Sequence, residues 1–212
     1  PVLLERVPKV DLVVGPDGYR NLPELIGLAR GGDRVSDTEF RGWEHYEDVP
    51  AVRVPGPTQF VTVQRGCDYR CTFCVVPYTR GPERSRNLAA VVEEVRALAD
   101  AGTGEVTLLG QTVNSWNDGS HDFGDLLRAV GAVDGIRRVR FTSPYPTDFT
   151  DSVIAAMAET EAVCEHVHLP VQSGSNAVLR RMLRRYTTGK YLDVVARLRA
   201  AMPDVTFSTD II

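Results

Sequence analysis

Three cysteines stand within eight residues of one another, at Cys67, Cys71 and Cys74. They directly follow a short apolar stretch, 60–63, that has the composition of a β-strand. Thiolates are the preferred ligands of iron–sulfur clusters, and a [4Fe-4S] cluster usually takes four of them. Because this loop supplies three, one iron would be left open for a ligand other than cysteine. We therefore predict that these three cysteines hold a [4Fe-4S] cluster.

A zinc ion is the alternative interpretation, with Cys164 or a histidine as the fourth ligand. Structural zinc usually takes two separated pairs of ligands, and no second pair follows in this sequence. The cluster is therefore preferred. Cys164 fits an inert buried thiol better than a ligand, and His166 and His168 alternate along a predicted strand as structural residues would.

Composition excludes several classes of protein. The 212 residues are 43% hydrophobic, which suffices for one large domain or two small ones. No apolar run approaches the roughly 18 residues of a membrane span, and no signal peptide is recognisable at the start. We expect a cytoplasmic protein with reduced thiols and no membrane contact. The net charge of -4 argues against indiscriminate binding of nucleic acid, although 65–86 and 180–190 are locally basic.

Strand and helix patterns alternate from residue 59 onward, which predicts an α/β fold with a largely parallel sheet. Strands are expected at 60–63, 105–109, 138–142, 166–171 and 206–212. Helices are expected around 91–99, at 148–159 with a cap at Thr150, at 176–185 and at 190–201. About five βα units fit a partial barrel, since a closed eight-unit barrel typically needs about 250 residues. We expect the barrel to be cut short after its fifth strand.

Polar residues follow the predicted strands at the ends where such sheets bind ligands. They are Gly66, Cys67, Gly110, Gln111, Asn114, Ser143, Gln172 and Ser173. The region before the sheet reads as two segments. Residues 10–30 predict a strand, a turn and a short helix, which is too little to fold alone, and 31–57 predict a linker.

The C-x3-C-x2-C spacing, with Phe73 before the last cysteine, resembles the radical S-adenosylmethionine (SAM) enzymes. Further motifs are similar to the methylthiotransferases of that superfamily, and among these to the MiaB-type tRNA enzymes. They are Gln64-Arg65-Gly66-Cys67, Cys74-Val75-Val76-Pro77-Tyr78-Thr79-Arg80-Gly81, Arg84-Ser85-Arg86, Leu108-Leu109-Gly110-Gln111-Thr112-Val113-Asn114-Ser115, Thr142-Ser143-Pro144, His168-Leu169-Pro170-Val171-Gln172-Ser173-Gly174-Ser175 and Thr209-Asp210-Ile211-Ile212. The resemblance covers essentially the whole chain and departs from the family pattern at Thr112, Trp116 and Tyr145.

The resemblance implies a radical SAM core at 58–212, incomplete at its C-terminus, with 1–30 as the tail of the family's N-terminal domain. It implies SAM on the open iron and conversion of N6-isopentenyladenosine beside a tRNA anticodon into its 2-methylthio derivative. The family's sulfur-donating second [4Fe-4S] cluster would need cysteines that this sequence lacks. The implied partners are tRNA, SAM and an electron donor such as flavodoxin or ferredoxin, and a monomer is expected.

Two related activities and one non-enzymatic role remain open. The related enzymes act on threonylcarbamoyladenosine in tRNA or on a ribosomal protein. The motifs at 76–78 and 110–112 differ from those of the ribosomal-protein enzymes. The threonylcarbamoyladenosine enzymes are the closer alternative, although they usually lack the Gln-x-Val-Asn pattern found at 111–114. The non-enzymatic alternative is a metal-stabilised RNA-binding module.

Residue roles follow from the resemblance and from local charge. The cluster and SAM would carry the radical chemistry, so no side chain is expected to be catalytic. We expect SAM contacts from Phe73, Gly110, Gln111, Gln172 and Ser173. For the arginines beside the cysteines and at 180–185, the alternatives are a solvated surface or the binding of tRNA phosphates or the SAM carboxylate. The candidates for substrate binding are Arg80, Arg84, Arg86, Arg184 and Arg185.

Overall fold

The computed structural model describes residues 2–46, 49 and 53–212. Its first segment contains α1 (Val2–Arg6), β1 (Leu12–Val14), the 3-10 helix η1 (Tyr19–Asn21), α2 (Leu22–Arg30) and β2 (Val35–Asp37). β1 and β2 pair in parallel with α2 between them. The predicted strand and helix are confirmed by β1 and α2. However, β2 lies inside the predicted linker, of which 47–48 and 50–52 fall outside the described residues.

The second segment alternates strands and helices. Its strands are β3 (Thr58–Thr62), β4 (Gln64–Arg65), β5 (Arg84–Ser85), β6 (Glu105–Leu109), β7 (Arg138–Phe141), β8 (His166–His168) and β9 (Thr206–Ser208). Its α-helices are α3 (Val76–Thr79), α4 (Leu88–Asp100), α5 (Phe123–Gly131), α6 (Asp151–Glu159), α7 (Asn176–Arg181) and α8 (Thr188–Ala201). Two further 3-10 turns are η2 (Val113–Ser115) and η3 (Pro146–Asp148).

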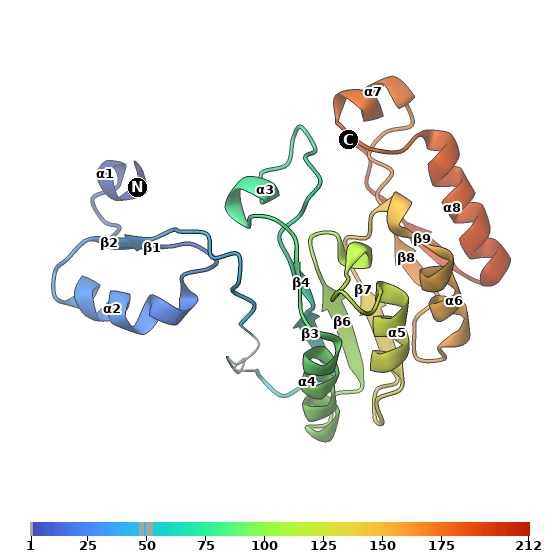
Figure 1. Ribbon diagram of the computed structural model, residues 1–212, viewed down its shortest axis with the longest axis horizontal. Helices are drawn as coiled ribbons and strands as arrows, with labels where there is room; N and C mark the ends of the chain where they lie inside the picture. The colour runs from blue at the N-terminus through green and yellow to red at the C-terminus, as the bar shows by residue number, and fades with distance from the viewer. Residues whose placement is uncertain (1, 47–48, 50–52) are drawn as a thin grey trace.

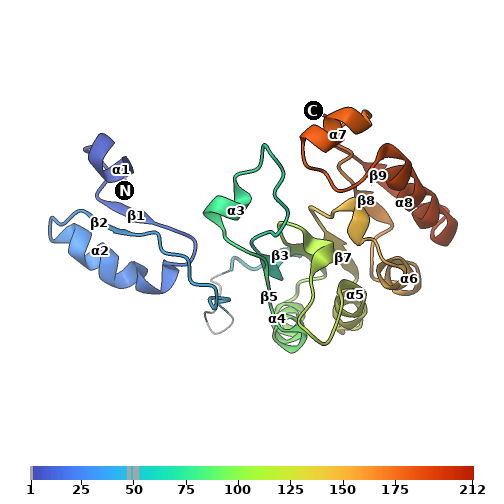
Figure 2. The same ribbon diagram turned by 45° about the horizontal axis from the view of Figure 1, so that its top comes forward.

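The main strands run parallel, as the alternation predicts. β3 pairs with β6, β6 with β7, and β8 with β9. A parallel bridge from Val139 to Val163 continues the order from β7 toward β8. α4, α5, α6 and α8 lie along one side of these strands, whereas α3 and α7 both stand at the upper edge in Figure 1. Figure 2 shows the same curved arrangement, which does not close within the described residues. The predicted α/β partial barrel is confirmed.

Local sequence explains where the helices begin. Thr150 caps α6 by accepting from Val153 N, as predicted, and Asn87 caps α4 by accepting from Ala89 N. Such caps satisfy N–H groups that the first helical turn leaves without partners. Because the strands are covered on the helical side, β6 carries the fully buried Val106 and Leu108.

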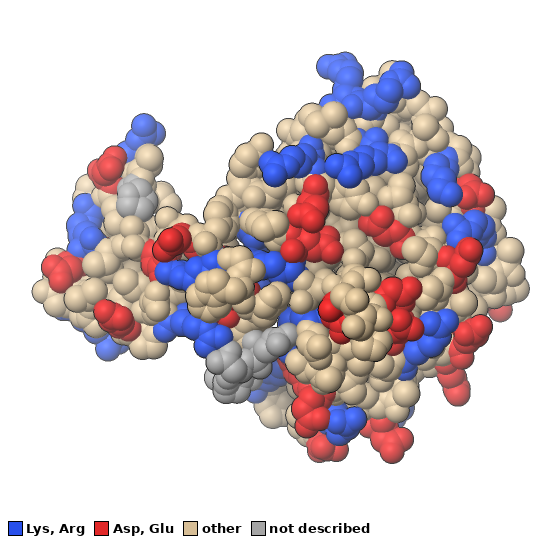
Figure 3. Space-filling view, in the orientation of Figure 1, with Lys and Arg blue, Asp and Glu red and all other residues tan. Residues whose placement is uncertain are grey.

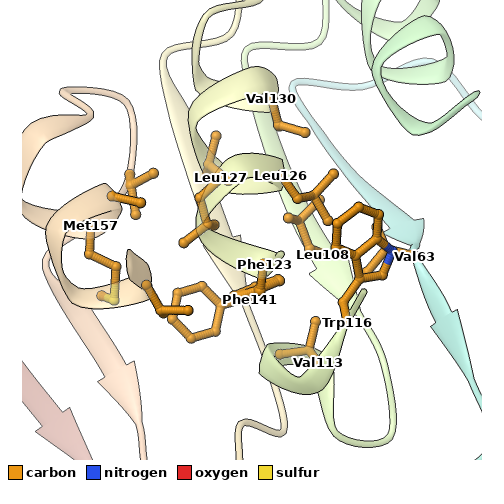
Figure 4. Packing of buried hydrophobic residues seen from close by; sticks show 14 of the residues in the cluster. Val63, Leu108, Val113, Trp116, Phe123, Leu126, Leu127, Val130, Phe141 and Met157 are labelled. Atoms are coloured by element: carbon orange, nitrogen blue, oxygen red, sulfur yellow. The ribbon is translucent and has the colours of Figure 1, made fainter. Parts of the chain in front are cut away.

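α5 is a helix that the sequence analysis did not identify. It begins with a capping box between Asp122 and Asp125 and buries Leu126, Leu127 and Val130 against the strands. Figure 4 shows these residues packed with Leu108, Trp116 and Phe141 around the helix. Gly124 permits close packing on α6, since a Cβ there would lie 2.5 Å from Ser152 Oγ. This core fixes the loops that follow β6 and β7.

The predicted helix at 176–185 is too long. α7 ends at Arg181, and Leu183 has the left-handed φ of 55°. Of the residues expected on its apolar face, Leu179 is buried whereas Leu183 is 55% exposed. The apolar spacing continues past the end of the helix because the sequence marks no stop there.

The helices that the structure describes include no candidate for a membrane span, since each is too short or too polar.

Candidate metal centre

The cysteine loop is closed by a short antiparallel pair, in which Gln64 faces Ser85 and Arg65 faces Arg84. Gly66 begins the loop with φ +75°, and a Cβ at this position would lie 1.9 Å from Pro82 O. Only glycine tolerates both the conformation and the contact. Cys67 N donates to Gly81 O at 3.2 Å, and Cys74 N donates to Cys71 O at 3.0 Å. These bonds fold the loop back on itself and fix its backbone.

The three predicted metal ligands open onto one cavity of about 260 Å³. The loops after β6, β7 and β8 complete its wall, as expected for the carboxyl ends of parallel strands. The lining residues are Cys67, Tyr69, Cys71, Phe73, Cys74, Gln111, Thr112, Ser143, Pro144, Tyr145, His168, Pro170, Gln172, Arg184 and Asp210. The polar residues that follow the predicted strands in the sequence therefore indicate where the cavity lies.

The donor set of this cavity fits an iron–sulfur cluster. All three cysteines are free thiols, and Cys67 and Cys71 are each 9% exposed. In the described part of the chain, no three His, Cys, Asp or Glu side chains converge on a single metal ion. Three thiolates that each bind a different iron need not converge in that way, and iron–sulfur clusters are held by thiolates. Cys67, Cys71 and Cys74 would hold such a cluster.

An arginine supplies positive charge to the same cavity. The Arg184 guanidinium carbon lies 5.4 Å from the ring centre of Phe73 and 5.4 Å from that of Tyr145, a cation–π arrangement. Burial raises the pKa of the Cys71 thiol, and the charge of Arg184 opposes that shift. The Cys71 thiol thus lies near a cation that contacts two aromatic rings.

An aromatic wall forms one side of the site. Tyr69 stacks on Tyr145 with ring centres 3.9 Å apart, and its hydroxyl donates to Asp148 Oδ1 at 2.8 Å. Burial, together with the neighbouring Asp148 carboxylate, raises the pKa of Tyr69, so it stays a neutral donor. Asn114, one of the strand-end residues, holds the backbone of Tyr145 through both polar atoms of its amide. These bonds fix the wall in place.

The five predicted SAM-contact residues fall into two groups. Phe73, Gln111 and Gln172 line the cavity, whereas Gly110 and Ser173 are buried beside it without lining it. Gln111 is partly engaged, because its Oε1 accepts from Gly66 N at 2.6 Å. Gln172 has a left-handed φ of 64°, which turns the chain sharply at the cavity wall.

Several residues that line the cavity were not predicted as site residues. Ser143 follows β7 with φ 60°, and Thr112 follows Gln111 after β6. Ser143 was noted as a strand-end residue, and Thr112 as a departure from the family pattern. His168 was interpreted as structural, and its Nε2 lies 3.2 Å from Asp210 Oδ2 in the cavity wall. Its place after a predicted strand marks Ser143, but no local pattern marks Thr112 or His168 as site residues, because separate strands contribute to the wall.

Two of the predicted substrate-binding arginines are corrected by the structure. Arg84 and Arg86 are 7% and 9% exposed. Arg84 pairs with Asp17, and Arg86 pairs with Glu94 at 2.6 Å. Buried arginines that already pair with carboxylates cannot reach the phosphates of a ligand at the surface. Arg80 and Arg185 are exposed, and Arg184 lies in the cavity wall.

A larger cavity of about 890 Å³ lies elsewhere, between α4 and a group of residues that includes Tyr19, Tyr46 and Arg53. No cysteine lines it. Two of its arginines, Arg53 and Arg86, are paired with Glu94. The smaller cavity therefore remains the candidate site, because it alone of these two holds the metal-binding side chains.

Comparisons with known proteins agree with this geometry. Residues 61–212 match the model of the Radical SAM superfamily. The chain is 45% identical over 211 residues to a protein of Cereibacter sphaeroides and 44% identical over 220 residues to one of Bartonella tribocorum. Both are named tRNA-2-methylthio-N(6)-dimethylallyladenosine synthase, and each match covers 99% of this chain and 48% of the relative. The chain thus spans about half the length of the curated relatives it matches.

A solved structure supports the fold. The radical SAM methyltransferase TsrM from Kitasatospora setae, solved with cobalamin and a [4Fe-4S] cluster, aligns with a TM-score of 0.67 at 20% identity. The alignment covers 93% of this chain and 46% of TsrM. The family model matches 61–212, and the three cysteines line one cavity of the expected fold. The chain therefore belongs to the radical SAM superfamily.

Proposed function

We propose that this chain is the catalytic core of a tRNA methylthiotransferase that converts N6-isopentenyladenosine beside the anticodon into its 2-methylthio derivative. The main support for this proposal is that the chain is 44–45% identical, over 99% of its length, to enzymes named for that product. The cavity lined by Cys67, Cys71 and Cys74 supports the same activity. When bound, a [4Fe-4S] cluster and SAM supply reductive cleavage of the sulfonium and a 5'-deoxyadenosyl radical.

The protein's own residues bind and orient these groups. Cys67, Cys71 and Cys74 would hold the cluster at the cavity that they line. Arg184 provides a guanidinium for the SAM carboxylate, since arginine binds carboxylates through paired hydrogen bonds. Phe73, Gln111 and Gln172 line the space left for the rest of SAM, and Gly110 and Ser173 support that wall from behind.

Exposed arginines near the cavity are the proposed tRNA contacts. Arg185 is exposed with its guanidinium 5.3 Å from the ring centre of Tyr69, a cavity residue. Arg80 is exposed at the end of α3. Figure 3 shows basic side chains gathered over α7, whose last turn carries Arg180 and Arg181. Such groups attract the phosphates of RNA without sequence preference.

The proposal extends to the cellular setting. The protein acts in the cytoplasm as a monomer and receives electrons from a flavodoxin or ferredoxin. Sulfur transfer requires a second [4Fe-4S] cluster with its own cysteines. One cysteine, Cys164, remains in this sequence beyond the cavity, so these 212 residues do not supply the ligands of a second cluster.

Mass spectrometry of tRNA nucleosides tests the proposal. A strain that lacks the gene should lose the 2-methylthio group from isopentenyladenosine. The full-length gene should restore it, the Cys71→Ala variant should not, and the matched Cys164→Ala variant should. Loss of methylthiolation from threonylcarbamoyladenosine, or from a ribosomal protein, would assign the chain to those activities. An unchanged set of modifications would favour an RNA-binding module instead.

A further inference from the structure

One cysteine of the cavity makes a side-chain hydrogen bond. Cys67 Sγ lies 3.1 Å from Thr112 Oγ1, although the two residues are 45 positions apart. Both residues are buried, with exposures of 9% and 2%. Within the described residues, neither Cys71 nor Cys74 has a comparable partner for its sulfur.

The backbone of Thr112 is held in place by two side chains. Gln64, which is fully buried, accepts from Thr112 N through Oε1 at 3.0 Å and donates through Nε2 to Thr112 O at 3.0 Å. Ser115 Oγ donates to the same carbonyl at 2.7 Å. One side-chain amide thus binds both the N–H and the carbonyl of Thr112. Gln64 lies in β4, three positions before Cys67.

The direction of this hydrogen bond becomes fixed once metal is bound. In the free thiol either atom can be the donor. A thiolate that binds iron has no proton, so the threonine hydroxyl must donate to sulfur. Hydrogen bonds to cluster sulfurs, together with solvent exposure and net charge, set the reduction potential of the cluster. A donor stabilises the more negative, reduced state and therefore raises the potential.

We propose that Thr112 is a positioning residue that raises the reduction potential of the cluster through an O–H···S hydrogen bond to Cys67. The inference rests on the proposed function, because it requires the cluster. It assigns a role to one of the three positions at which the sequence departs from the family pattern. The Gln64 amide holds the backbone of Thr112 beside Cys67, so the effect does not depend on SAM or tRNA.

The experiment compares Thr112→Val, which keeps the shape but lacks the donor, with Thr112→Ser, which keeps the donor. Each protein is reconstituted anaerobically with iron and sulfide. Redox titration followed by electron paramagnetic resonance gives the midpoint potential. The valine variant should bind the same amount of iron and titrate at a more negative potential, and the serine variant should titrate close to the wild type.

Electron–nuclear double resonance of the reduced cluster supplies a second measurement. The wild type should show a proton coupling that disappears in D2O and is absent from Thr112→Val. If the valine variant fails to take up iron, Thr112→Ala takes its place. The exchangeable proton should then be present in the wild type and in Thr112→Ser and absent from Thr112→Ala.

The outcomes separate the two proposals. A wild type that binds no iron would overturn the cluster and with it the proposed function. A wild type with an intact cluster, but with equal potentials and equal proton couplings in the valine and serine variants, would overturn the role of Thr112 alone.

Discussion

Asp17 and Arg84 form a buried ion pair that joins the first segment of the chain to the cysteine-bearing hairpin. Arg84 donates to Asp17 Oδ2 at 3.0 Å and to Oδ1 at 3.1 Å, and the Arg84 and Asp17 side chains are 6% and 1% exposed. The same guanidinium also donates to the carbonyls of Arg41, Glu44 and Arg80. Residues 67 positions apart are thus fixed together at the base of the cysteine loop.

We expect Asp17→Ala to destabilise the chain by about 3–5 kcal/mol, because it leaves the Arg84 charge buried without its carboxylate. Urea unfolding of the protein measures the change in stability. The matched control is Glu93→Ala, which breaks the exposed pair with Arg96 and should cost less than about 1 kcal/mol. Equal destabilisation in the two variants would show that the buried pair is not important for stability.

Cluster binding should depend on Cys71 and not on Cys164. After anaerobic reconstitution, the wild type should hold about four irons per chain with broad visible absorbance, as expected for one cluster. Cys71→Ala should lose both signals because a cavity ligand is gone, whereas Cys164→Ala should keep them. One tightly held zinc without iron would contradict the prediction.

Binding of tRNA should weaken with salt, since arginines that bind phosphates release counterions. Arg185→Ala should lower the affinity and reduce the slope of log affinity against log salt concentration by about one. The control is Arg96→Ala, an arginine that is 55% exposed on α4, away from the cavity. Affinity measured by fluorescence anisotropy at several salt concentrations decides the matter, and equal effects in both variants would refute a specific arginine surface.

Stability at low pH should depend on Asp118. Burial alone would raise its pKa, but the N–H groups of Leu88, Ser120 and His121 outweigh burial and lower the pKa to about 2. The carboxylate therefore stabilises the fold above its usual pKa near 3.8, and this contribution is lost as the pH falls toward 2. Asp118→Asn should be less stable at neutral pH and lose less stability between pH 4 and pH 2.

Thermal unfolding of both proteins across that pH range measures the difference. Asp122→Asn provides the control, because it changes another carboxylate in the same region, the N-cap of α5. Parallel pH profiles for the wild type and Asp118→Asn would contradict the prediction.

Substitution at Gly66 should disrupt the cysteine loop. Gly66→Ala would place a methyl group 1.9 Å from Pro82 O at a φ of +75°, so we expect destabilisation of at least about 2 kcal/mol. Iron uptake should fall with it. The matched change is Gly102→Ala, which also has a positive φ of 94° but meets no atom within 4 Å. If both variants take up iron equally, the close approach of Gly66 to Pro82 is not essential.

The amino-acid sequence by itself determined the pattern of elements and the position of the site. Alternating strands and helices from residue 59 onward were predictable because each has a local periodicity, and Thr150 was identified as a cap from its own neighbours. The placement of three cysteines after a strand, with polar residues after later strands, predicted one shared cavity, since parallel strands end on the same side.

Only the tertiary structure decided which charged and polar side chains reach that cavity. Arg84 looks like an RNA-binding residue in the sequence, but Asp17 neutralises it from 67 positions away. Arg184 was predicted to continue a helix, and it lies instead between Phe73 and Tyr145. Thr112 meets Cys67 because separate strands bring them together. Local periodicity carries no information about such partners, whose proximity depends on the packing of the whole sheet.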